Sequence, residues 1–454
     1  MAYTHLTGAG RVSGNLERRQ LIRAVVGSTI GTTVEWYDAI LYALLVPFYL
    51  GRLFFPAGDP LASTLSGYLG LGVSFGARFF GAAFFGRFGD RAGRKATLVI
   101  TLLFGGVASA LIGFLPTYAQ IGVAAPILLL VLRACVGFAL GGEWGGAVLL
   151  TLEWGNHQRR GLWSAFPQIG AVGATVLGFV AIATSTALVG PQSPWAWRLP
   201  FIASLALVAV GLYVRLGILE TPTFSKLMEE RRTERRPVRT VLARNPREVI
   251  LTALIKIGDQ VPLVLMTTFF LVYTGVLHLP MGIAITISIW SGLVGIVCTP
   301  LFGYVSDRIG RRRTYFYGAL LMFLFALPYF ALIGSRDVGL ILGASVVAQV
   351  MVAMMAGPEA ALIAESFTGR LRYSGASLGA GLGAPLGGGV ASALGVILLQ
   401  RFHSAVPVGL YMMGCCALSI IGVGLLRERR DQDLSIEYDD PRASGPAAAV
   451  VARP

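Results

Sequence analysis

The sequence is divided almost completely into twelve apolar runs, each long enough for a helix to cross a lipid bilayer, which takes roughly 20 residues. The runs lie at 23–50, 63–86, 96–115, 123–151, 162–187, 197–219, 249–277, 281–305, 314–334, 338–364, 373–399 and 405–426. Charged residues are only 13% of the chain, against roughly 25% in a soluble domain. Helices satisfy their own backbone hydrogen bonds in lipid, and no ten-residue alternating strand pattern is present. The sequence therefore predicts an all-α polytopic membrane protein.

The basic residues gather on one side of this predicted bundle. Of the 37 Lys and Arg residues, 30 fall in the N-terminus and in every second connection after it, whereas the opposite connections hold only Arg52, Arg198, Arg336 and Arg401. Cytoplasmic loops of membrane proteins carry such an excess. Both termini are therefore expected in the cytoplasm, and the net charge of +14 needs no nucleic-acid partner to explain it.

The chain contains an internal repeat. FGRFGDRAGRKAT at 85–97 returns as FGYVSDRIGRRRT at 302–314, and six predicted helices separate the copies. Because six is even, both copies face the same side, and the halves are parallel repeats. The predicted domains are a tail (1–22), a six-helix bundle (23–219), a basic linker broken by prolines (220–248), a second bundle (249–426) and a disordered tail (427–454), with tails and linker in the cytoplasm.

Each residue type in the repeated loop has a physical use. Glycines permit a tight turn between helices and close backbone approach, and Asp90 and Asp307 can cap or pair at a neighbouring helix end. A well-made turn with cytoplasmic charge would explain one copy. Two copies at equivalent positions are a more specific signal.

This duplicated Gly-x-x-x-Asp-Arg-x-Gly-Arg motif, with twelve spans and a long central loop, resembles the major facilitator superfamily. VEWYD at 34–38, RACVGFALGGEWGGA at 133–147, WRLPF at 197–201 and RYSGASLG at 372–379 resemble its metabolite:proton symporter branch, which carries shikimate, α-ketoglutarate, citrate, and proline or betaine. Glu359 departs from the branch pattern, which has glutamine there. The resemblance implies two halves that rock about a central cavity, but it does not identify the substrate.

The resemblance also implies that the repeated loops latch the cytoplasmic side of the cavity. The residues assigned to this gate are Gly86, Gly89, Asp90, Arg91, Gly93 and Arg94 in the first copy, Gly303, Asp307, Arg308, Gly310 and Arg311 in the second, and Glu365 and Arg372 near the ends of the tenth and eleventh runs.

Charged residues inside the apolar runs are few. The acids are Glu35, Asp38, Glu143, Asp259, Glu359 and Glu365, and the bases are Arg78, Arg133 and Lys256. A charge at the bilayer centre costs roughly 2.5–3.5 kcal/mol or more, so such residues normally face the bundle interior. Burial disfavours an unpaired carboxylate. The surplus of three acids therefore predicts that some of them are protonated for part of a transport cycle.

Asp38 is the predicted proton-titrating residue, with Arg133 as its exchangeable partner. Pairing would favour the ionised carboxylate and release the proton, and separation would reverse this. The alternative is a permanent structural ion pair. Glu35, three residues earlier on the same helix face, is the reserve candidate, and Glu143 is either a coupling site or a structural hydrogen-bond acceptor.

Substrate contacts are expected from both halves. Arg78, Arg133 and Lys256 would grip a carboxylate, since guanidinium groups bind it in a bidentate manner. Arg78 could equally be a structural partner of the acids in the first run. Lys256 and Asp259 could equally neutralise each other. Glu359, Trp36 and Tyr42 complete the predicted site, although packing is the commoner role for a single aromatic residue.

The sequence predicts a monomeric secondary transporter in a bacterial plasma membrane that imports a small organic acid (mono- or dicarboxylate) or a zwitterionic metabolite with protons. An osmolyte carrier for betaine or proline and a transporter-like membrane sensor are the alternatives. No enzyme, cofactor or metal is expected, because all four histidines fall in predicted tails or loops and no phosphate-binding loop is present.

Overall fold

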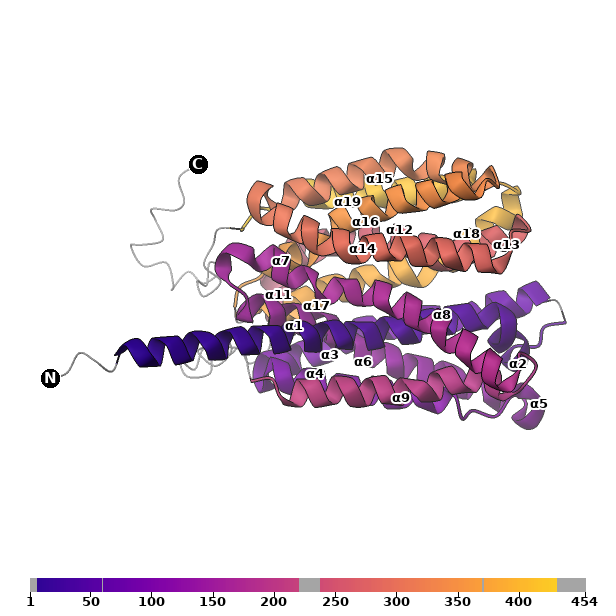
Figure 1. Ribbon diagram of the computed structural model, residues 1–454, viewed down its shortest axis with the longest axis horizontal. Coiled ribbons are helices and arrows are strands. Elements are labelled where there is room, and N and C mark those ends of the chain that lie inside the picture. Colours follow the sequence, from indigo (N-terminus) through magenta and orange to yellow (C-terminus); the bar gives the residue numbers. More distant parts are fainter. Residues whose placement is uncertain (1–5, 59, 220–236, 370, 431–454) are drawn as a thin grey trace.

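The computed structural model describes residues 6–58, 60–219, 237–369 and 371–430 (Figure 1). The first half of the chain forms α1 (Leu6–Leu45), α2 (Gly51–Phe54), α3 (Pro60–Ala92), α4 (Arg94–Ile112), α5 (Tyr118–Ile121), α6 (Ala124–Trp154), α7 (Arg160–Ala165), α8 (Gly170–Val189) and α9 (Trp195–Leu216). The second half forms α11 (Pro237–Arg244), α12 (Pro246–Val264), α13 (Phe270–Val276), α14 (Met281–Ile309), α15 (Arg311–Gly334), α16 (Val338–Glu365), α17 (Arg372–Ala384), α18 (Val390–Phe402) and α19 (Val406–Leu425).

Twelve helical stretches among the described residues are long and apolar enough to cross a membrane, which confirms the predicted all-α polytopic fold. Apart from the start of the first helix, every observed boundary lies within five residues of the predicted one. The first helix nevertheless begins at Leu6, so most of the predicted tail 1–22 continues the first span as helix. Residues 1–5 and 431–454, which belong to the predicted tails, and residues 220–236 of the linker lie outside the described ranges.

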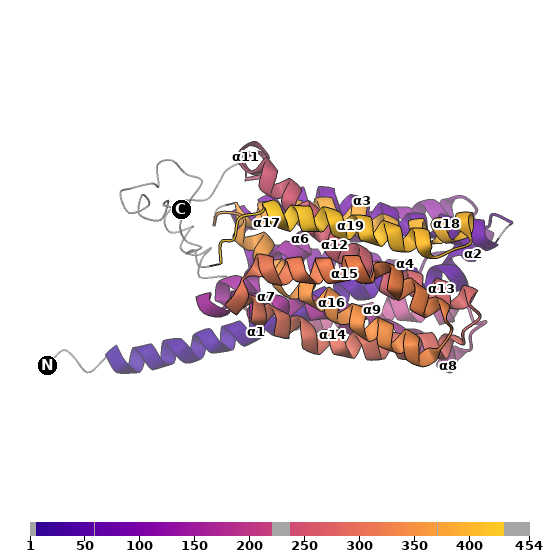
Figure 2. The same ribbon diagram turned by 90° about the horizontal axis from the view of Figure 1, so that it is seen from above.

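The spans form two bundles that lie side by side (Figures 1 and 2). In Figure 1 the helices from α1 to α9 occupy the lower part, and most of those from α12 to α19 occupy the upper part. We call these bundles the N half and the C half. The turns from α3 to α4 and from α14 to α15 lie at one end of the molecule, which we call the basic end.

The backbone repeats as the sequence does. Gly93 and Gly310 precede α4 and α15 with φ of 107° and 109°, a conformation that favours glycine. A widened π-helical turn interrupts the first span at Val46–Leu50 and the seventh at Leu265–Phe269, which are equivalent places in the two halves. Such turns are frequent at functional sites.

The described part of the linker, residues 237–248, is largely helical, whereas the sequence indicated a segment broken by prolines. Pro237 and Pro246 act as helix starters rather than breakers, because proline is favoured in the first turn. Val241 of α11 is fully buried. The end of the linker is therefore a short amphipathic helix whose apolar face packs against the bundle.

Helix packing places α17 directly against α12. Gly379, Gly383 and Gly387 recur every four residues, and a Cβ on each would lie within 3.0 Å of an α12 side-chain or backbone atom. Small residues at this spacing let two helices approach closely in a membrane. This contact brings the middle of α17 and the charged turn of α12 to the same cavity wall.

Candidate functional site

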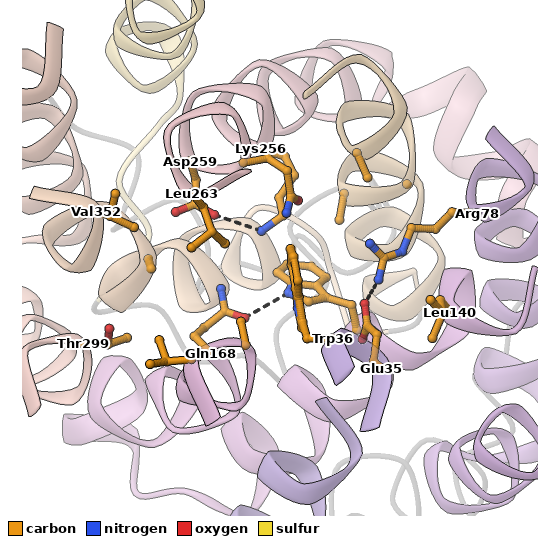
Figure 3. A pocket seen from close by; sticks show the side chains of 18 of the residues that line it. Glu35, Trp36, Arg78, Leu140, Gln168, Lys256, Asp259, Leu263, Thr299 and Val352 are labelled. Carbon is orange, nitrogen blue, oxygen red and sulfur yellow. Dashed lines mark hydrogen bonds and ion pairs between the residues drawn. The ribbon is translucent and has the colours of Figure 1, made fainter. Parts of the chain in front are cut away.

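A cavity of about 40 Å³ lies between the halves. It holds a few water molecules at most, since one water needs roughly 10–15 Å³ by this measure. Its polar and aromatic lining comes from Glu35, Trp36, Arg78, Trp144 and Gln168 of the N half and from Lys256, Asp259, Gln260, Thr299, Gln349 and Ser377 of the C half. Figure 3 shows the Glu35–Arg78 and Lys256–Asp259 pairs on separate sides of it.

The N half carries two ion pairs near the cavity. Glu35 on α1 pairs with Arg78 on α3. One turn along α1, Asp38 pairs with Arg133 on α6 and accepts a 2.5 Å hydrogen bond from Ser109 Oγ. All four charged side chains are buried. The two acids of α1 therefore have separate partners.

Glu35 lies between the central cavity and the surroundings of Asp38. It lines the central cavity and also a smaller cavity of about 20 Å³ that Asp38, Ser109 and Glu143 line. A third small cavity joins Glu35 and Arg78 to Arg133. Asp38 itself does not line the central cavity. Glu35 therefore adjoins both the central cavity and the cavity that Asp38 lines.

Glu143 pairs with a residue that the sequence analysis missed. Arg215 Nη1 of α9 donates a 3.0 Å hydrogen bond to Glu143 Oε2, and Thr101 Oγ1 donates another of 3.0 Å. Arg215 was not counted among the bases of the apolar runs, yet only 2% of its side chain is exposed. The sequence did carry one signal for this pair: Glu143 lies in an apolar run and had no basic partner assigned to it.

The predicted surplus of three buried acids is therefore wrong. Arg215 pairs with Glu143 and Arg311 pairs with Glu365, and neither base was counted among the buried ones. The span that contains Arg311 begins three residues before its apolar run, and Arg215 lies near the end of α9; both side chains are buried. For the six acids counted from the sequence, the surplus falls to one.

The remaining surplus lies at Lys256. Its Nζ donates to Glu359 Oε2 at 2.7 Å and to Asp259 Oδ2 at 3.3 Å, so one base serves two acids. The N half reaches this cluster through Gln168, whose Nε2 donates to Glu359 Oε2 at 2.9 Å. Trp144 lies beneath the ammonium group, with Nζ 5.2 Å from its ring centroid.

The structure brings together some of the predicted substrate residues and not others. Arg78, Lys256, Asp259 and Trp36 line the central cavity. Glu359 lies behind Lys256 and is fully buried. Arg133 and Tyr42 are outside the lining: the Arg133 guanidinium stacks 4.3 Å from the Tyr42 ring centroid, and the Tyr42 hydroxyl donates to Gly67 O at 2.9 Å.

Neutral polar residues of the lining were not found from the sequence. Gln168, Gln260 and Gln349 sit in apolar spans, and only a search for charged side chains was made there. Amide side chains in membrane helices form hydrogen bonds to neighbouring helices, as charged side chains do. Extending that search to Gln and Asn would have identified these three positions.

The two aspartates of the repeat each reach the start of a helix in the other half. Asp307 accepts hydrogen bonds from Gly161 N at 2.9 Å and Leu162 N at 3.0 Å, in the first turn of α7. Asp90 accepts one from Ser374 N at 3.0 Å, in the first turn of α17. A carboxylate stabilises the free N–H groups and positive dipole of a helix start. The halves are thereby held together at the basic end.

Other gate residues surround these contacts. Arg311 donates to both oxygens of Glu365 at 3.2 Å and to Asp307 at 2.6 Å. Arg372 is fully buried and lies 3.7 Å from Glu153 of the other half.

The gate glycines permit contact between the halves. A Cβ on Gly86, Gly89 or Gly303 would lie 3.0 Å or less from an atom of the opposite half. Arg91 and Arg308 are exposed, and the side chain of Arg94 lies outside the described residues.

Known proteins resemble this chain in sequence over most of its length. The sequence model of the Major Facilitator Superfamily matches residues 28–372 and 278–447. The inner membrane metabolite transport protein YhjE of Escherichia coli (strain K12) is 36% identical over 420 residues, which cover 91% of this chain and 95% of YhjE. The shikimate transporter of the same organism is 33% identical over 425 residues, covering 91% of this chain and 96% of that protein.

The fold has a close match among solved structures. The proton:xylose symporter XylE bound to 6-bromo-6-deoxy-D-glucose superimposes with a TM-score of 0.73 at 16% identity, covering 92% of this chain and 98% of XylE. The expectation of a transporter rather than an enzyme is confirmed by the relatives. The chain belongs to the major facilitator superfamily, in the branch that contains these metabolite transporters.

Proposed function

We propose that this protein is a secondary active transporter that imports a small organic acid or zwitterionic metabolite together with protons, by alternating access. The observation that carries the proposal is the central cavity, which buried ionisable groups from both halves enclose. A cavity between two bundles held together at one end suits a solute that is exposed first on one side and then on the other.

Different relatives support different parts of this proposal. YhjE is an inner membrane metabolite transport protein, which favours the bacterial inner membrane as the location. The shikimate transporter favours a small organic acid as the cargo, and XylE is a proton symporter. The bias of Lys and Arg to one side favours cytoplasmic termini and a cytoplasmic basic end. We propose a monomer as the working unit, since the cavity lies within one chain.

The proton step is assigned to Asp38. Its carboxylate is held by Arg133 and Ser109, so it is stable as an ion while both contacts last. Movement of α6 relative to α1 would remove the guanidinium, and a buried carboxylate without its partner takes up a proton. Glu35, which lies between Asp38 and the central cavity, would pass this proton on.

Arg78 and Lys256 are the proposed substrate-binding cations. They line one cavity from two halves, and each is already paired with a carboxylate. An anionic solute would exchange with those carboxylates rather than fill an empty site. Binding would therefore rearrange ion pairs in both halves at once, which links the solute to the motion of the halves.

A zwitterionic osmolyte such as betaine is the second candidate. When Asp259 and Glu359 are both ionised, the described charged groups around the cavity, which also include Glu35, Arg78 and Lys256, sum to one negative charge. The rings of Trp36 and Trp144 line the same space. A negative cavity with aromatic faces is the environment in which quaternary ammonium groups bind.

Uptake into proteoliposomes tests the proposal. Purified protein would be reconstituted, and radiolabelled shikimate, α-ketoglutarate and glycine betaine would be offered with and without an inward proton gradient. We expect one probe to accumulate above its external concentration only when the gradient is present. Equal uptake with and without the gradient would exclude proton coupling, and binding without uptake of any probe would favour a transporter-like sensor.

A further inference from the structure

The acids around the cavity are neutralised differently in the two halves. In the N half, Glu35, Asp38 and Glu143 each have an arginine partner: Arg78, Arg133 and Arg215 respectively. In the C half, Asp259 and Glu359 share the single base Lys256. With every group ionised, the C-half cluster carries one net negative charge.

Burial makes this charge costly. The side chains of Lys256, Asp259 and Glu359 are 7%, 3% and 0% exposed. Asp259 Oδ1 and Glu359 Oε1 are buried and accept no hydrogen bond from the described residues. An uncompensated buried ion costs several kcal/mol, whereas one added proton would make the cluster neutral.

Few other ionisable groups face the cluster. Among the described residues, Tyr315 of α15 lies within electrostatic range of both acids, and Cys416 of α19 within range of Asp259. Neither supplies a positive charge. Arg78 lines the cavity but is paired with Glu35. The contacts from the N half, Gln168 and Trp144, are neutral.

We propose that Asp259 and Glu359 together form a second proton-binding site, which holds one shared proton in the conformation described here. Both carboxyl groups contact one ammonium group, so the proton belongs to the pair rather than to either residue. This site is separate from Asp38, which lies in the other half and has its own arginine.

The site can link protons to the solute and to the motion of the halves. An anionic solute that binds Lys256 competes with the two carboxylates, and so favours retention of the proton. Gln168 of the N half donates to Glu359 and stabilises its ionised form. When the halves separate at this contact that donor is lost, so the affinity for the proton changes with the conformation. The role in transport rests on the proposed symport function, whereas the existence of the site does not.

Infrared spectroscopy detects the shared proton without any substrate. The protein would be titrated from acid to alkaline pH in dodecyl maltoside, which has no carbonyl group, and the C=O stretching band of protonated carboxylic acids would be followed. We expect a band that persists at neutral pH and disappears on alkalinisation, and that is lost at neutral pH in Glu359→Gln and in Asp259→Asn.

Two further variants keep the test decisive. Lys256→Gln leaves two buried acids without a base, so the band should grow about twofold as both become protonated. Glu365→Gln is the matched control, because that carboxylate is held by Arg311 and is expected to be ionised. A neutral-pH band that is absent from the folded wild-type protein, or unchanged in both cluster variants, would overturn the proposal.

The transport role has its own measurement. For whichever of shikimate or glycine betaine the wild-type protein accumulates, Glu359→Gln should move one proton fewer per solute molecule. An unchanged proton ratio would overturn the transport role of the site. Accumulation of neither probe would count against the proposed function, while the infrared result would still decide whether the proton site exists.

Discussion

The two halves share a fold but neutralise the acids around the central cavity differently. In the N half, three acids have three arginines, and two of these pairs stand apart from the central cavity. In the C half, one lysine at the cavity wall serves two acids. Duplication therefore preserved the helices and their turns while the buried charges diverged. In the mechanism proposed above, the N half would take up a proton when the Asp38–Arg133 pair separates, whereas the C half would hold one because two acids share a base.

Asp38→Asn should have the largest effect on transport. Removing the titrating group of the N half should reduce accumulation to the external concentration, whereas a proton driving force of about 100 mV supports roughly fiftyfold accumulation in the wild type. The measurement is gradient-driven uptake in proteoliposomes. Exchange of labelled for unlabelled solute, which needs no net proton movement, is the control and should survive. Undiminished uphill uptake would remove Asp38 from the mechanism.

Arg215→Gln should have the largest effect on stability. It leaves Glu143 buried with only Thr101 as a partner, and breaking a buried ion pair on one side costs about 3–5 kcal/mol. The free energy of unfolding in detergent should recover in the double variant Arg215→Gln/Glu143→Gln, since no uncompensated charge remains. If the double variant were as unstable as the single one, the pair would not be a neutralising contact of the N half.

Asp307→Asn should weaken the contact between the halves at the basic end. An aspartate that caps a helix start contributes about 0.5–2 kcal/mol. Hydrogen exchange of the α7 amides of Gly161 and Leu162 should therefore accelerate several-fold, because about 1 kcal/mol corresponds to roughly a fivefold change.

Asp90→Asn is the matched variant in the other half. It should accelerate exchange at Ser374, at the start of α17, and leave the amides of α7 unchanged. Equal acceleration at both helices in either variant would show that the two contacts are one cooperative unit rather than two equivalent ones.

Tyr42→Phe should have the smallest effect. The ring beneath Arg133 is kept and only the hydroxyl donor to Gly67 O is lost, which costs about 0.5–1.5 kcal/mol of unfolding free energy. Tyr42→Leu also removes the ring and should cost more, by about 0.5–2 kcal/mol for the cation–π contact. Thermal unfolding compares the two. Identical stability would mean that the ring does not hold the guanidinium in place.

The fold could be predicted from the sequence because the features that determine it are visible in short segments of the chain. Apolar run length sets the spans, and the repeat at 85–97 and 302–314 sets the symmetry. The capping role of Asp90 and Asp307 also followed from residue type, although the helix starts that they reach did not.

The charge pairing did not follow from the sequence, because it depends on which helices touch. Arg215, near the end of its apolar run, was not counted as a buried base, yet α9 places it beside Glu143. Arg133 was grouped with Arg78 as a substrate ligand, yet it packs on Tyr42 away from the cavity. Gln168 carries no charge and gave no signal, although it joins the N half to Glu359.

The most direct test of the account is the movement of protons with the solute. Proteoliposomes would enclose a pH-sensitive dye, and the accumulated probe would be added outside without any imposed gradient. We predict that the lumen acidifies as the solute enters, and that Asp38→Asn abolishes the acidification while solute exchange continues. Solute entry at the wild-type rate with no change of luminal pH would contradict the account.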